Sequence, residues 1–237
     1  MKKFLISLAA ALLCGVTASA QQFTIRAEAG PAFSFSSLAT HGVNILGSGT
    51  KIGYHVAGMV DVNLYKGLYA SAGLSFEMKG AKGKLKEDNS LLGKIGSMIN
   101  KEAQNEITMH YLQIPVNIGY KLSLTPSIGI GIQTGPYFAF GLGGTQNTGI
   151  KAADAVQSFN VFKEGIMGLN KVKRYDIGWG ASAMAYFSNY YATVGADFGF
   201  LNIAESDTQG TVAQVANQVK GLSFKNSTVY VGIGYCF

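Results

Sequence analysis

Nine ionisable residues of this chain lie in segments where side-chain character alternates from one position to the next. All nine fall on the face that carries small or polar residues: Arg26, Glu28, His55, Asp61, Glu77, Lys79, Lys121, Asp176 and Asp197. Such a set predicts either an ion path with a gate or a salt-bridged plug, because charges removed from water must pair. We expect the plug, and with it negligible ion conductance.

The three histidines do not form a catalytic or metal centre by their spacing. His41 lies in an expected loop, His55 on the polar face and His110 on the opposite face, and no His-x-His or His-x3-His pair is present. An enzyme acting on lipid acyl chains would need a histidine, a serine and a carboxylate close together. His110 near Glu106 is the one candidate pair, without an identifiable serine. We therefore expect no enzyme activity, catalytic residue, metal or cofactor, and keep a lipid-modifying enzyme as an alternative.

The first twenty residues have the pattern of a signal peptide. Lys2 and Lys3 precede an apolar stretch, and the small residues that end at Ala20 suit cleavage there. We expect a signal peptide at 1–20 and one domain at 21–237. The mature part has 17 basic and 13 acidic residues and a single cysteine, Cys236. This charge is too small to suggest nucleic acid, and one cysteine forms no intramolecular disulfide.

The elements that must position the charged face are strands. In 111–122 every second residue is apolar and the residues between are polar or small, which is the period of a strand. The pattern repeats in the segments 23–36, 52–65, 67–80, 127–142, 173–187, 190–203 and 228–237. These eight segments are mostly longer than the five or six residues usual in soluble sheets, and suit the ~9–11 residues that cross a bilayer.

The polar face decides between a membrane barrel and a soluble exported sandwich. A sandwich would turn a face rich in Lys, Glu, Thr and Arg to water. Here the face is rich in Gly, Ser, Ala, Asn, Gln and Tyr, and only 14% of the 237 residues are charged, against about 25% in an average protein. Glycines would let tyrosines fit inside a narrow eight-stranded barrel. We expect the barrel, and keep the soluble sandwich as an alternative.

The connections alternate between short and long. Short turns lie near Lys66, near 123–126 and at Ser188 and Asn189, whereas long connections span 37–51, 81–105, 143–172 and 204–224. Outer-membrane barrels have short periplasmic turns and long external loops. We therefore expect the outer membrane of a Gram-negative bacterium, with both termini in the periplasm.

Several motifs resemble those of the PorT-like outer-membrane β-barrel family. Residues 111–116 (YLQIPV) are similar to its "YLxIP" strand, 135–137 (GPY) and 176–180 (DIGWG) suit the strands that follow, and 231–237 (VGIGYCF) is similar to its terminal strand. The resemblance covers essentially the whole mature chain. It implies the barrel and its location but no common reaction. It also implies that Phe237 is the signal for the outer-membrane assembly machinery.

The long connections carry apolar residues at helical spacing, in 91–99, 212–222 and, partly, 156–166. Such helices would either cap the barrel mouth or form a docking surface for an external protein, lipopolysaccharide or a glycan.

Together these patterns predict an all-β, eight-stranded antiparallel up-and-down transmembrane barrel with short helices in its external loops. We expect a non-enzymatic structural or surface-binding role, with a narrow channel as an alternative. The expected partners are outer-membrane lipid and lipopolysaccharide, the assembly machinery and an external protein or glycan, but not nucleic acid.

Overall fold

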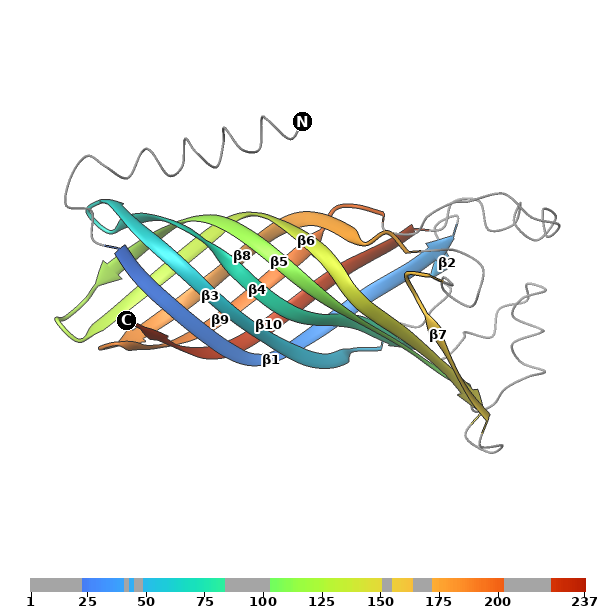
Figure 1. Ribbon diagram of the computed structural model, residues 1–237. Coiled ribbons are helices and arrows are strands. Elements are labelled where there is room, and N and C mark those ends of the chain that lie inside the picture. Colours follow the sequence, from blue (N-terminus) through green and yellow to red (C-terminus); the bar gives the residue numbers. More distant parts are fainter. Residues whose placement is uncertain are drawn as a thin grey trace, which may run out of the picture.

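The computed structural model describes residues 23–40, 43–44, 49–83, 103–150, 155–163, 172–202 and 223–237 (Figure 1). Its strands are β1 (Phe23–Thr40), β2 (Val43–Asn44), β3 (Lys51–Tyr65), β4 (Leu68–Gly83), β5 (Ala103–Ser123), β6 (Ile128–Ile150), β7 (Ala155–Asn160), β8 (Tyr175–Phe187), β9 (Tyr190–Gly199) and β10 (Ser223–Cys236). In the described part, eight long antiparallel strands follow one another in the sheet, and β1 pairs back with β10. The predicted eight-stranded antiparallel barrel is confirmed.

The two ends of the barrel differ in their connections. Lys66 and Gly67 join β3 to β4 with φ angles of 42° and 90°, and Ser188, with φ 57°, opens the turn from β8 to β9. Between β5 and β6, Thr125 accepts a 2.9 Å hydrogen bond from the amide of Ile128 at its Oγ1. These turns and Phe237 lie at one end, here named the turn end; the opposite end is the loop end (Figure 1).

Side chains alternate between the two surfaces of the barrel, as the sequence pattern predicts. On β5, Ile114, Val116 and Ile118 point outward and are 45–53% exposed, whereas Tyr111 and Gln113 are buried inside. The apolar outward belt of this strand runs from Leu112 to Leu122, a length that crosses a bilayer when tilted. No helix in the described ranges is long and apolar enough to span a membrane.

Strands β5 and β6 continue past the barrel at the loop end and are joined there by β7 (Figure 1). Residues 155–160 are therefore a strand, and the expectation of a helix beginning near Val156 is wrong. Pairing with the extended β6 satisfies the backbone groups of this segment, and this tertiary pairing outweighs its partial helical pattern. The other two expected loop helices, in 91–99 and 212–222, lie outside the described residues.

Tyrosines fill the barrel by lying against glycines of neighbouring strands. The four pairs are Tyr69 with Gly119, Tyr137 with Gly178, Tyr230 with Gly195 and Tyr191 with Gly234. In each pair a Cβ on the glycine would overlap the tyrosine ring, so no larger residue fits there without a shift. The glycines thus allow large side chains inside a narrow barrel.

Candidate functional site

The interior of the barrel near the turn end holds a buried ion pair between β1 and β3. Arg26 donates from Nε to Asp61 at 2.6 Å and from Nη2 at 3.0 Å, and it is 1% exposed. The same Nη2 donates to the side-chain oxygen of Gln133 at 2.9 Å. The Arg26 guanidinium also lies over the Tyr191 ring, 5.5 Å from its centroid. Charge, hydrogen bonding and packing therefore all fix this arginine.

Towards the middle of the barrel, His55 lies between two carboxylates. Its Nε2 is 3.0 Å from Glu28 Oε1 and its Nδ1 is 3.0 Å from Glu77 Oε1. If both carboxylates are ionised, they only accept, so both ring nitrogens donate and the imidazole carries a positive charge. The ring stacks on Tyr230 with centroids 4.0 Å apart, and Tyr191 donates to the second oxygen of Glu28 at 2.8 Å.

Lys79 extends the network across the lumen. Its Nζ lies 3.3 Å from Glu77 and donates to Gln113 at 3.0 Å, and Gln113 in turn donates to Asp197 at 2.8 Å. The lysine also lies 4.6 Å from the centroid of the Tyr137 ring. Strands β4, β5, β6 and β9 are thereby connected through the interior.

Three of the nine residues form no ion pair in the described part: Asp197, which accepts its hydrogen bond from neutral Gln113, Lys121 and Asp176. Lys121 is only half-buried near the turn end, where its Nζ lies 4.0 Å from the Tyr186 ring centroid, and it pairs with no carboxylate of the described part. Asp176 is buried near the loop end, and no described basic residue lies within 4 Å of it. Arg174 donates to the Gly141 carbonyl at 3.2 Å.

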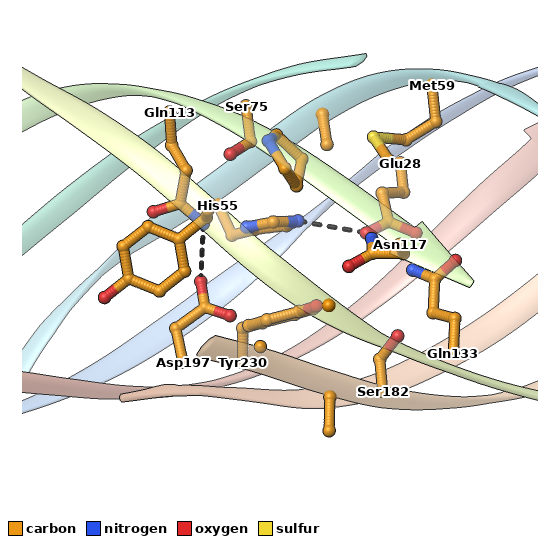
Figure 2. A pocket seen from close by; sticks show the side chains of 16 residues that line it. Glu28, His55, Met59, Ser75, Gln113, Asn117, Gln133, Ser182, Asp197 and Tyr230 are labelled. Carbon is orange, nitrogen blue, oxygen red and sulfur yellow. Dashed lines mark hydrogen bonds and ion pairs between the residues drawn. The ribbon is translucent and has the colours of Figure 1, made fainter. Parts of the chain in front are cut away.

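A small cavity of about 30 Å³ lies in the middle of this network (Figure 2). Figure 2 shows His55, Asp197 and Tyr230 around it, with Gln113 reaching Asp197 from above. Ser75 and Tyr137 also line it, and neither hydroxyl makes a hydrogen bond to the described residues. The volume accommodates one or two water molecules, far less than a hydrated ion requires.

An apolar cap closes the network at the loop end. After β7 the chain turns back, and Val161 accepts a hydrogen bond from the amide of Val172 at 3.3 Å. Phe162 is 7% exposed and packs edge-on against Tyr111, while Arg174 covers it from 5.0 Å. The buried cluster consists of Ala81, Ile107, Met109, Tyr111, Tyr137, Ala139, Val161, Phe162 and Val172. A cap over the mouth was one of the two alternatives for 156–166, but a strand and a chain reversal form it in place of the expected helix.

A second cluster lies near the turn end, formed by Tyr69, Met184, Tyr186 and Tyr191 with Cys236 packed against it. The interior thus has an apolar cap, a charged middle and an aromatic layer. Nine ionisable positions were found from strand period alone, but the neutral partners Gln113, Gln133 and Tyr191 were not singled out, because glutamine and tyrosine on a polar face carry no distinguishing signal.

On the outer surface at the loop end, His110 contacts Tyr54 and not Glu106. Tyr54 OH and His110 Nδ1 are 2.9 Å apart. Glu106 instead accepts from Lys51 and lies 3.5 Å from Lys82. The hydrogen bond from Lys51 holds the pKa of Glu106 below its ordinary value. In the described ranges no three His, Cys, Asp or Glu side chains gather to hold a metal; His41 lies outside them.

Residues 19–205 match the family described as outer membrane protein beta-barrel domain. None of the curated proteins compared matches this chain.

Several solved outer-membrane proteins are similar in structure. Ail, the attachment invasion locus protein of Yersinia pestis, in complex with the heparin analogue sucrose octasulfate, is 10% identical with a TM-score of 0.44, covering 91% of this chain and 99% of Ail. A major outer membrane protein from Thermus thermophilus is 14% identical with a TM-score of 0.47, covering 91% and 100%. OprG from Pseudomonas aeruginosa is 10% identical with a TM-score of 0.39, covering 92% and 97%.

Proposed function

This chain belongs to the outer membrane protein beta-barrel domain family, and from that premise we propose that it is a closed, non-conducting and non-enzymatic barrel. It anchors a loop end that binds partners outside a Gram-negative cell. Within the family, we assign this chain to the PorT-like barrels, whose strand motifs it resembles. The expected external partners are lipopolysaccharide and a protein or glycan ligand.

One observation carries the proposal of a closed barrel: paired charges and rings occupy the interior from one end to the other. The Arg26–Asp61 pair, the Glu28–His55–Glu77 group and the Phe162 cap lie at successive levels. A channel needs a continuous hydrated path, and the described cavity of about 30 Å³ is too small to supply one.

The alternative of a lipid-modifying enzyme receives less support. The pair considered for it, His110 with Glu106, is not in contact, since each residue has another partner. Hydrolysis with a histidine as the base would need a nucleophile and a carboxylate hydrogen-bonded to the same imidazole ring.

Single-channel recording in planar lipid bilayers tests the closed barrel. We expect no stable currents from the purified wild-type chain. The matched variant is Arg26→Ala with Asp61→Ala, which removes one level without leaving an unpaired charge. Because the Glu28–His55–Glu77 group and the Phe162 cap remain, we expect no stable current from this variant either. Large, stable wild-type currents would contradict the proposal.

Export and assembly are part of the same proposal. Sequencing the mature protein should give Gln21 as its first residue if the signal peptide is residues 1–20. Phe237 is 73% exposed at the turn end, and we expect Phe237→Ala to slow assembly by the outer-membrane machinery. Tyr190→Ala is the control, because Tyr190 is a similarly exposed aromatic at the same end. Equal assembly rates for the two variants would argue against a signal at Phe237.

A further inference from the structure

His110 is the first outward residue of β5 beyond the apolar belt that runs from Leu112 to Leu122. At this position a side chain meets the headgroup region rather than the acyl chains if the barrel spans the bilayer as proposed. The ring is half-buried among aromatic neighbours: the Tyr54 centroid is 6.0 Å away and the Phe76 centroid 6.2 Å away, both in stacked geometry. The histidine is therefore held in one orientation on the outer surface.

The hydrogen bond to Tyr54 determines what this histidine offers to its surroundings. Tyr54 OH and His110 Nδ1 are 2.9 Å apart, and with the phenol hydroxyl as the donor the ring proton lies on Nε2. No described residue accepts a hydrogen bond from Nε2. His110 thus presents one oriented N–H donor on the outer face.

Charges above His110 make this sector basic. Lys82 has a side chain that is 55% exposed, and its nearest carboxylate, Glu106, is already bound by Lys51. Two lysines and one glutamate leave a net positive charge. Among the described residues Glu106 is the one acidic side chain that is not buried, while Lys163 and Lys225 are further exposed cations at the loop end.

The two donors lie along neighbouring strands. Met78 pairs with His110 and Lys82 pairs with Glu106, so Lys82 is four residues beyond the level of His110. At about 3.3 Å per residue this is roughly 13 Å along the strand. A single ligand that contacts both groups must therefore have a large headgroup.

We propose that Tyr54, His110 and Lys82 form a binding site for the phosphorylated headgroup of an outer-leaflet lipid, of the kind carried by lipid A. The inference rests on the proposed function, which places the loop end outside the cell. His110 Nε2 donates to a phosphate oxygen, Lys82 supplies charge, and Tyr54 positions the ring. The lipid is favoured over a free anion because the donor lies at the edge of the belt, where acyl chains pack beside it.

Native mass spectrometry of the folded chain in detergent tests the site, with diphosphoryl lipid A, its dephosphorylated form and inorganic phosphate as separate probes. The variants are His110→Phe, which keeps the ring stacking, and Lys82→Met, which keeps the stem length. Lys66→Met at the turn end is the matched control. Loss of a charge-assisted hydrogen bond predicts an approximately tenfold lower affinity for diphosphoryl lipid A in each site variant. The control variant should bind this lipid with the affinity of the wild type.

Unchanged affinity in both site variants would overturn the proposal, as would equal binding of the phosphorylated and dephosphorylated lipids. If inorganic phosphate displaced the lipid fully at a similar concentration, the ligand of the site would be a free phosphate and not a lipid headgroup. Heat-modifiable gel mobility confirms that each variant is folded. Channel recording is independent of lipid affinity, so failure of the closed barrel and failure of this site are separately observable.

Discussion

Replacing Arg26 with methionine should strongly destabilise the barrel. The methionine keeps most of the stem but removes the guanidinium, and Asp61 is then left 7% exposed without its cation. Breaking a buried ion pair by removing one partner costs about 3–5 kcal/mol, which is roughly two to nearly four orders of magnitude in the unfolding equilibrium. Gln133 loses a donor as well, although these losses are not additive.

Urea unfolding in lipid vesicles measures this effect, and the single tryptophan, Trp179, reports it by fluorescence. The double variant Arg26→Met with Asp61→Asn should recover most of the loss, because no unpaired charge remains. Lys121→Met is the matched control, since Lys121 is half-buried and has no described carboxylate partner; we expect a cost within about 1 kcal/mol. Equal costs for the two single variants would mean that water screens the charges of the interior, and the argument for a plug held by buried ion pairs would be refuted.

Three further perturbations test the packing and the rim. Gly195→Ala places a Cβ into the Tyr230 ring and should lower the free energy of unfolding in urea by about 1–3 kcal/mol. Gly58→Ala is the control, because open space surrounds Gly58, and it should be nearly neutral. Equal effects of the two variants would count against ring-to-glycine packing. Phe162→Ala removes a buried ring from the cap and should cost about 3–5 kcal/mol in the same assay; a cost below about 1 kcal/mol would mean that the cap is loose. The folded-state pKa of Glu106 is lowered, so its stabilising contribution is present above the unfolded pKa of about 4.3 and is lost as pH falls through the folded value. The wild type should therefore exceed Glu106→Gln in urea midpoint at pH 7, and this advantage should shrink below about pH 4; an advantage independent of pH would contradict the ion pair.

The strand period predicted which positions face inward, because successive side chains of a strand point to opposite surfaces. Of the charged residues predicted to face inward, eight are buried, and Lys121 lies half-buried near the turn end. Period alone does not say how far a residue lies from the barrel mouth. That depth depends on the register with the neighbouring strands, here β4 and β6.

At a bulge between β5 and β6, the period-two pattern no longer predicts which side chains face inward. Tyr111 pairs with Gly141 and His110 with Gly143, so Leu142 has no counterpart on β5. Beyond this point the inward side of β6 changes from odd to even positions, and Gln146 is buried. A continuous period-two pattern would have placed Gln146 outside.

The sequence by itself determined the barrel, the face of each strand that points inward and the candidate charges on it, since these follow from local alternation and from the lengths of turns and loops. Only the tertiary structure decided which charges meet. Gln113 on β5 reaches Asp197 on β9, and Phe162 returns over the mouth to contact Tyr111. Such contacts depend on strand tilt and register around the whole closed sheet, which are collective properties of eight strands.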